Sequence, residues 1–183
     1  EVADVAGAVY DGTDAIMLSA ETAVGKYPLE SISTMSSISI NVENEIAKNG
    51  NFQINEPQFK KTNVLTSICH AAYNIALDIN IPIIAVMTES GSTARMVSRY
   101  RPKPRIIAMT PFELIARQLE IVWGIKSFVV PSYDSSDYIP DIAKNVLKAE
   151  GQLLNKEKFV ITGGVPVGIK GTTNYLSVLK IEK

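Results

Sequence analysis

The chain has 183 residues, of which 46% are hydrophobic and 20% are charged. This composition provides enough apolar side chains for a sizeable core and excludes a disordered, collagenous or entirely coiled-coil chain. Its 18 basic and 19 acidic residues give a formal net charge of −1, so the sequence has no global basic character that would favour nucleic acid or an anionic membrane. We therefore expect neither nucleic acid nor a membrane among its partners.

Cysteine and histidine each occur once. The lone Cys69 excludes an internal disulfide and a zinc site built on cysteines, and the lone His70 excludes a metal motif with two histidines. The longest apolar run, residues 81–87, is far too short to span a bilayer. We expect no metal site and no membrane span in this sequence.

The first residues predict an amphipathic helix, because four apolar side chains share one face: Val2, Val5, Ala6 and Val9. The chain starts at Glu1 inside this helix, without an initiator Met or a visible signal peptide, so we expect it to be part of a longer protein. Residues 11–12 end the helix, residues 14–19 form a short apolar strand, and residues 21–28 form a loop. Pro28 then starts a second helix, with the apolar stripe Leu29, Ile32, Met35, Ile38, Val42 and Ile46.

A polar segment with little periodicity, residues 49–61, interrupts the pattern and is predicted to be a linker or a surface loop. We place a domain boundary near its start. The predicted domains are therefore residues 1–46 and residues 47–183.

After residue 62, amphipathic helices alternate with apolar strands. The strands are predicted at residues 82–88, 105–110, 126–130, 157–162 and 173–181. A helix before the first strand is expected to have the apolar face Val64, Ile68, Ala71, Ile75 and Ile79, and further helices are expected at residues 91–101, after a capping box from Thr110 to Glu113, and from Ile139 to about Gly151.

Continuous apolar strands separated by helices predict an α/β fold, with a five-stranded, mostly parallel sheet covered on both faces. The connection between the last two strands, residues 163–172, is too short for a crossover helix. The last strand is therefore predicted to run antiparallel to the fourth.

Ligands of such sheets bind outside the carboxyl ends of the strands, so the loops there are the candidate sites. After the first of these strands, the loop contains hydroxyl groups and a glycine at a helix N-terminus, which could hold a phosphate: Thr88, Ser90, Gly91, Ser92 and Thr93. An ordinary capped turn is the alternative interpretation. Glu89 would oppose an anion if its carboxylate pointed inward.

A second candidate is the glycine-rich loop that joins the last two strands. This loop could close over an anionic ligand through the residues Lys170, Gly171, Thr172 and Thr173. A long hairpin connection between the two strands would explain the same residues. A third candidate is the pair Ser19 and Glu21, which follows the strand predicted at residues 14–19 and is typical of an active-site rim or of a capped loop.

Other conspicuous residues are assigned structural roles. His70 lies in the middle of a predicted helix, and no acidic residue shares its face, so a structural or surface role is favoured over catalysis. The basic side chains between Arg95 and Arg105 are expected on a solvated helix face, although they could help to hold phosphate or a partner subunit. Trp123 is expected to be a packing residue.

Three segments together resemble the pyruvate kinase family. Residues 3–30 (ADVAGAVYDGTDAIMLSAETAVGKYPLE) resemble the last part of its catalytic barrel. Residues 87–110 (MTESGSTARMVSRYRPKPRIIAMT) and 162–174 (TGGVPVGIKGTTN) resemble the effector loops of its C-terminal domain. The resemblance implies that residues 1–46 are the end of a (β/α)8 barrel, in a helix–strand–helix arrangement, and that residues 47–183 are the regulatory domain.

The resemblance also implies an activity. In this family phosphoenolpyruvate transfers its phosphoryl group to ADP, giving pyruvate and ATP in glycolysis, with Mg²⁺ or Mn²⁺ and K⁺. The family's catalytic lysine, metal-binding acids and nucleotide ligands have no match here, so the chain alone is expected to be inactive, with no catalytic or metal-binding residue. Ser19 and Glu21 match the barrel rim and would be supporting residues. The family implies a cytoplasmic homo-oligomer, typically a tetramer.

The effector site carries over residue by residue. Thr88, Ser90, Gly91, Ser92 and Thr93 match the loop that holds phosphate, and residues 168–173 match the loop that closes over the effector. Members activated by fructose 1,6-bisphosphate often have a basic residue where this chain has Glu89, and they have an arginine in the region of residues 137–141, which has none here. AMP, ribose 5-phosphate or glucose 6-phosphate is therefore the expected effector. A stand-alone phosphate-binding module and a purely structural oligomerisation domain are the alternatives.

Overall fold

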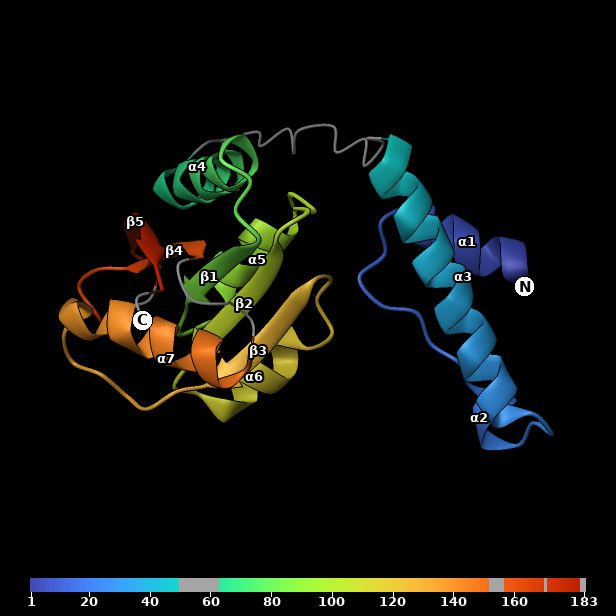
Figure 1. Ribbon diagram of the computed structural model, residues 1–183. Coiled ribbons are helices and arrows are strands. Elements are labelled where there is room, and N and C mark those ends of the chain that lie inside the picture. Colours follow the sequence, from blue (N-terminus) through green and yellow to red (C-terminus); the bar gives the residue numbers. More distant parts are fainter. Residues whose placement is uncertain (50–62, 152–156, 170, 182–183) are drawn as a thin grey trace. The chain divides into compact units, whose positions relative to one another are not determined.

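A computed structural model describes residues 1–49, 63–151, 157–169 and 171–181. The chain divides into two compact units, Glu1–Ile54 and Asn55–Lys183 (Figure 1). In the described residues no helix is long and apolar enough to cross a membrane. The prediction of a domain boundary near residue 46 stays a prediction, because the residues between the two units lie outside the described part.

The described residues of the first unit form three helices: α1 (Val2–Tyr10), α2 (Ala20–Ala23) and α3 (Pro28–Asn49). The opening helix is confirmed, and it ends where predicted, with Gly12 in the left-handed region at φ 78°. The start of α3 at Pro28 is also confirmed. The Tyr10 hydroxyl donates a 2.9 Å hydrogen bond to Glu45 Oε2, which joins the end of α1 to α3.

The strand predicted at residues 14–19 is wrong. These residues have no regular structure, and the predicted loop after them begins with the single turn α2. An apolar run becomes a strand only when a neighbouring strand satisfies its backbone N–H and C=O groups. The described residues of this unit contain no other strand that could pair with it.

The first unit buries little of its apolar surface. Among its described residues, the buried hydrophobic side chains are Val42 and Ile46, both near the end of α3, and neither α1 nor α2 buries any residue. A groove of about 620 Å³ runs between α1, the segment before α2, and α3, and its apolar lining includes Val5, Ala8, Ile16, Met17, Leu18, Met35 and Ile38.

The second unit contains the predicted five-stranded sheet, which is confirmed. Its strands are β1 (Ile83–Met87), β2 (Arg105–Thr110), β3 (Ile125–Val129), β4 (Lys158–Gly164) and β5 (Thr173–Lys180). They lie in the order β3-β2-β1-β4-β5. All neighbours are parallel except β4 and β5, which are antiparallel as predicted.

Two cores lie on the two faces of this sheet, and helices lie around it (Figure 1). Helices α4 (Val64–Asp78), α5 (Ser92–Ser98) and α6 (Glu113–Leu119) cover one face, onto which β1 projects Ile84 and Val86. The 3-10 turn η1 (Ser136–Tyr138) leads into α7 (Ile139–Ala149), which covers the other face, where Ile83 and Met87 point. The strands are apolar throughout because alternate side chains enter opposite cores.

Two details of the predicted helices are wrong. The capping box from Thr110 to Glu113 does not form, because Thr110 is the last residue of β2 and α6 begins only at Glu113. The predicted apolar face of α4 is also offset, since Val64 and Ile79 are exposed. The buried residues of α4 are smaller, which lets the helix pack closely on the sheet: Thr66, Cys69, Ala72 and Ala76.

Candidate functional site

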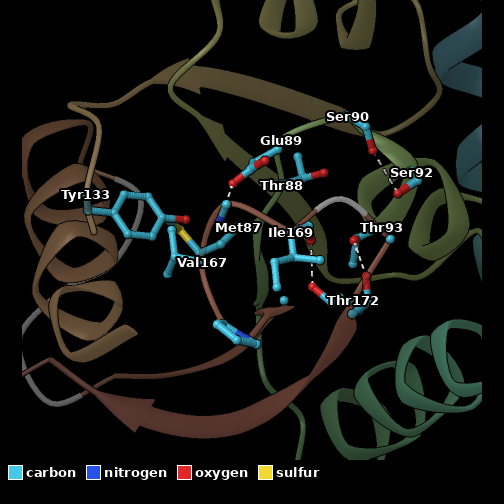
Figure 2. Close-up of a pocket in the computed structure, with 15 residues that line it drawn as sticks. Met87, Thr88, Glu89, Ser90, Ser92, Thr93, Tyr133, Val167, Ile169 and Thr172 are labelled. Carbon is cyan, nitrogen blue, oxygen red and sulfur yellow. Dashed lines mark hydrogen bonds between the residues drawn. The ribbon is translucent and has the colours of Figure 1, made fainter. Parts of the chain in front are cut away.

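The two candidate loops of the second unit meet at one pocket (Figure 2). In the sheet order, β2 and β3 lie on one side of β1, and β4 and β5 lie on the other. The order in which successive strands are added to the sheet therefore reverses between the parallel strands β1 and β4, and a crevice opens at the carboxyl ends of strands at such a point. The loops after β1 and β4 line the pocket with Thr88, Glu89, Ser90, Ser92, Thr93, Gly164, Pro166, Val167, Gly168, Ile169, Gly171, Thr172 and Thr173.

The loop after β1 is held by its own hydroxyl groups. The backbone N–H of Gly91 donates to Thr88 Oγ1 at 2.9 Å, and Ser90 Oγ donates to Ser92 Oγ at 3.1 Å. Gly91 has φ +79°, and a Cβ atom there would lie 2.5 Å from Arg95 Nη1. The left-handed backbone conformation therefore favours glycine at this position, and a Cβ atom there would also displace the Arg95 guanidinium.

Arg95 brings a positive charge to this loop. Its Nη1 donates to the carbonyl oxygen of Ser90 at 3.0 Å. One member of the basic run between Arg95 and Arg105 thus contacts the candidate site from within α5. A guanidinium at this position makes the surroundings of the loop more favourable for an anion.

The loop after β4 is joined to the first loop at two points. At its base, the hydroxyl oxygens of Thr93 and Thr173 lie 2.6 Å apart, and both side chains are buried. Near its middle, the backbone N–H of Gly168 donates to Glu89 Oε1 at 2.8 Å. Thr172 Oγ1 also donates to the carbonyl oxygen of Ile169 at 2.7 Å, within the loop (Figure 2).

The space enclosed by these loops is small. The cavity measures about 30 Å³, which is room for only one or two water molecules. A sugar phosphate is larger than this enclosed space.

Tyr133 also lines the pocket and was missed by the sequence analysis. It comes from the segment between β3 and η1, and in Figure 2 its ring lies beside Val167 and Met87. Burial raises the pKa of its phenol, and the negative charge of Glu89 raises it further. Its sequence surroundings carry no motif, so only the folded structure reveals that it reaches this pocket.

The other predicted site residues divide into three groups. Gly91 shapes the turn beside the pocket, and Lys170 lies outside the described residues. Ser19 and Glu21 belong to the first unit, where the Ser19 backbone N–H donates to Glu21 Oε2 at 2.9 Å. Hydrogen bonds from the Glu21 and Ser19 backbones lower the pKa of the Glu21 carboxyl. Their role at a barrel rim stays a prediction.

His70, Trp123 and Cys69 make contacts outside the pocket lining. His70 Nε2 lies 3.1 Å from Asn74 Nδ2, and its ring stacks on Tyr100. The Trp123 ring packs under the Arg101 guanidinium at 4.8 Å. Burial raises the pKa of the Cys69 thiol to about 12, so it is not a nucleophile near neutral pH.

The described residues contain no group of three or more His, Cys, Asp and Glu side chains that could hold a metal ion. The pocket instead offers hydroxyl groups and backbone N–H groups around the start of a helix. This arrangement suits an oxyanion such as phosphate, because neutral donors can surround its oxygen atoms.

Comparison with known proteins identifies the family. The model of the pyruvate kinase alpha/beta domain matches residues 66–179, and the model of the pyruvate kinase barrel domain matches residues 1–32. The chain belongs to the pyruvate kinase family. The five-stranded sheet and its antiparallel last pair agree with the fold predicted from the sequence.

Two groups of relatives support this assignment. Pyruvate kinases from Staphylococcus epidermidis and Staphylococcus aureus are 41% identical over 179 residues, which is 97% of this chain and 30% of each relative. The structure of Cryptosporidium parvum pyruvate kinase in complex with ADP is similar with a TM-score of 0.80 and 33% identity, and it covers 98% of this chain and 36% of the other. A second structure of the same enzyme has a TM-score of 0.81 and 31% identity. The chain therefore spans about a third of the length of these relatives.

Proposed function

We propose that this chain acts as part of a pyruvate kinase, which transfers the phosphoryl group of phosphoenolpyruvate to ADP during glycolysis in the cytoplasm. The match of both domain models, in the family's order along one chain, carries this proposal. Residues 1–46 would complete the catalytic barrel, and residues 47–183 would form the regulatory domain. The remainder of the enzyme would be the first partner of these residues.

The groove of the first unit supports this division. Its walls are apolar where α1 and the segment 14–19 leave side chains such as Met17 without cover in this unit. In a closed barrel, neighbouring strands would pair with the segment 14–19 and bury these side chains. Residues 14–19 would therefore form a strand only in the longer enzyme.

Catalysis would depend on parts of the enzyme beyond these residues. Phosphoryl transfer relies on metal ions and positioned charges, and the donor groups in the described residues do not form a metal site. Mg²⁺ or Mn²⁺ and K⁺ would therefore be bound elsewhere in the enzyme. The 183-residue chain, mixed with phosphoenolpyruvate, ADP, Mg²⁺ and K⁺, should form no pyruvate in a coupled assay. Turnover by the pure chain would contradict this proposal.

The pocket at the ends of β1 and β4 is the proposed effector site. Hydroxyl groups from both loops, the Gly168 backbone and the nearby Arg95 provide a setting for one phosphate group. Glu89 lies in the lining, and residues 137–141 contain no arginine for a second phosphate. AMP, ribose 5-phosphate and glucose 6-phosphate are therefore favoured over fructose 1,6-bisphosphate.

A thermal-shift series with these four compounds tests the effector proposal. We expect at least one monophosphate to raise the unfolding midpoint, because a ligand that binds only the folded chain stabilises it. Ser92→Ala should weaken the shift, whereas Ser37→Ala, a serine exposed on α3, should leave it unchanged. Stabilisation by fructose 1,6-bisphosphate alone would refute this order of ligands.

A homo-oligomer is the remaining part of the proposal. In the described sheet β5 pairs only with β4, so its other edge is open, and Val178 on this strand is partly exposed. Such an edge favours pairing with another chain. Analytical ultracentrifugation should show association of the second unit. If no phosphorylated compound binds and association persists, a structural oligomerisation domain becomes the better description.

A further inference from the structure

The strand β3 lies at one end of the described sheet, where it pairs only with β2. The Gly124 carbonyl oxygen and the Val130 N–H both bond to residues of β2. Along a strand, alternate residues direct their backbone groups to the same side, so the even-numbered residues between these two also face β2. The backbone groups of residues 125, 127 and 129 therefore face away from β2, along the outer edge of the sheet.

Two of these outward N–H groups are bonded within the chain. The Ser127 N–H donates to Glu120 Oε1 at 2.9 Å. The Ser127 hydroxyl donates to the carbonyl oxygen of Ala116 at 2.8 Å and lies within hydrogen-bond reach of the same Glu120 oxygen. The Ile125 N–H donates to the Val122 carbonyl oxygen at 3.3 Å. The turn that joins α6 to β3 thus occupies donors that a neighbouring strand would need.

The segment that carries this edge has the composition of a self-pairing strand. Residues 121–130 (IVWGIKSFVV) contain Lys126 as their one charged residue and no proline. High β-propensity, low charge and absence of proline are the signature of segments that pair with copies of themselves. Glu120 precedes the segment and Pro131 follows it, and charged residues or prolines at the flanks of such segments oppose pairing. Val129 is 55% exposed, so the segment is accessible at this edge.

We propose that Glu120 guards the outer edge of β3 against strand addition by a second copy of this chain. Its carboxylate occupies the Ser127 N–H group that a carbonyl oxygen of an incoming strand would otherwise accept from. Its charge would also lose water when another strand approached, which is unfavourable. A second copy is the expected partner because identical apolar segments satisfy each other's backbone groups. Glu120 and Ser127 lie outside the pocket lining, so this proposal is independent of the effector site.

The guard has a consequence for assembly, which rests on the association through β5 proposed above. Two copies that meet at their β5 edges form a closed pair. If the β3 edges could pair as well, each pair would add further copies at both ends, and an open-ended assembly would result. Glu120 would therefore limit the second unit to one pairing edge.

Two measurements on the 183-residue chain test this proposal. Hydrogen exchange of the Ser127 amide, followed by NMR in dilute solution, reports on the guard. Thioflavin T fluorescence and sedimentation velocity of concentrated samples report on strand addition. Glu120→Ala removes the acceptor, and Glu120→Gln keeps a neutral one. Glu113→Ala is the control, because it removes an equal charge from the exposed surface of α6, where Glu113 pairs with Arg117.

A double variant separates strand addition from unfolding. Val129→Lys, combined with Glu120→Ala, places a new charge on the same edge without restoring the acceptor for Ser127. Circular dichroism of every variant checks that the chain is folded.

We expect Glu120→Ala to speed exchange of the Ser127 amide by about tenfold or more, because a charge-assisted hydrogen bond is lost. In concentrated solution this variant should bind thioflavin T and sediment as large assemblies, whereas Glu113→Ala should behave like the unchanged chain. The double variant should exchange as fast as Glu120→Ala and sediment like the unchanged chain. Glu120→Gln should lie between Glu120→Ala and the unchanged chain in both measurements.

Three outcomes would overturn the guard. Unchanged exchange in Glu120→Ala would show that this carboxylate does not protect the Ser127 N–H. Fast exchange without large assemblies would show that the freed edge does not pair with a second copy. Assemblies that Val129→Lys fails to prevent would place the association on another surface. If Glu120→Ala does not fold, Glu120→Gln decides: faster exchange with partial assembly supports the guard, and no change in either measurement overturns it.

Discussion

The two units of this chain contain similar helical patterns but differ in what those patterns bury. In the second unit, apolar side chains from the helices meet the sheet and form two cores. In the first unit, α3 carries a comparable apolar stripe, yet Leu29 remains 74% exposed and Met17, before α2, remains 85% exposed. Apolar spacing therefore predicts a helix, whereas burial of its apolar face depends on a second surface that covers it.

This difference also indicates where stability resides. Each large side chain removed from water contributes about 1.5–3 kcal/mol to folding. The second unit has many such side chains, among them Phe159, Leu119 and Ile161, and the described part of the first has only Val42 and Ile46. We therefore expect the second unit to fold on its own and the first to depend on the rest of the enzyme.

The largest expected effect comes from emptying a core position of the second unit. Phe159→Ala removes a fully buried ring from the core that faces α7, so it should lower the free energy of unfolding by about 3–5 kcal/mol. Leu29→Ala, the matched change on α3, should alter it by less than about 0.5 kcal/mol. Urea unfolding followed by circular dichroism measures both. Equal losses would show that the first unit has a core of its own.

Replacing one glycine in each unit by alanine should change stability in opposite directions. Gly91→Ala forces a left-handed residue to carry a Cβ atom 2.5 Å from Arg95 Nη1, so it should destabilise the second unit by about 1–2 kcal/mol. Gly7→Ala meets nothing within 4 Å in the helix α1, so it should stabilise that helix by up to about 1 kcal/mol. Thermal unfolding compares them. Gly91→Ala without cost would mean that the turn adapts.

Cys69 makes the stability of the second unit depend on pH in a way that the first unit cannot share, because the first unit contains no cysteine. Burial raises the pKa of Cys69 to about 12, against an ordinary value of 9.0. Below pH 9.0 the thiol is protonated in both states. As pH rises from about 9 to about 12, the unfolded chain loses the proton and the folded one keeps it, so stability falls by about 1.4 kcal/mol per pH unit.

Comparing the chain with Cys69→Ala at pH 8 and pH 10 isolates this contribution. The stability advantage of the unchanged chain over the variant should be about 1.4 kcal/mol smaller at pH 10 than at pH 8. Other groups titrate equally in both proteins and cancel in the comparison. An advantage that does not change with pH would show that Cys69 ionises normally in the folded chain.

Helix caps give the smallest expected effects. Asn63 accepts a hydrogen bond from the Thr66 backbone and donates its own N–H to Thr66 Oγ1, both at 2.9 Å. Asn63→Ala should therefore cost about 1 kcal/mol. Ser19, the N-cap of α2, makes no such side-chain bond, so Ser19→Ala should change stability little. Chemical denaturation of both variants measures this difference, and an equal cost would contradict it.

The sheet was predictable from the sequence because its strands are short apolar runs between helices, and because residues 163–172 are too few for a crossover. The strand predicted at residues 14–19 does not form, since the described residues of this unit contain no other strand to pair with it. The capping box predicted at Thr110 does not form because Thr110 does have a strand partner. Thr110 is buried, and its backbone carbonyl oxygen accepts a hydrogen bond from the Val130 N–H, which keeps Thr110 in the sheet.

The candidate site was predictable only in part. The Thr88 loop has the composition of a phosphate cradle, and the glycine-rich loop points to a cover, so both could be found locally. Tyr133 and the bond between Glu89 and Gly168 could not, because they depend on how three separate loops meet above the sheet. Long-range contacts of this kind leave no periodic signal in a single sequence.

The central proposal is that a phosphorylated ligand binds at the pocket of the second unit. An NMR titration of the isotope-labelled chain with ribose 5-phosphate and AMP tests it most directly. We predict that saturating ligand shifts the backbone amide signals of Thr88, Ser90, Thr93, Gly168 and Thr172, while the signals of α1 and α3 stay in place. Unchanged signals at these five residues with both ligands, or shifts confined to α1 and α3, would contradict the account.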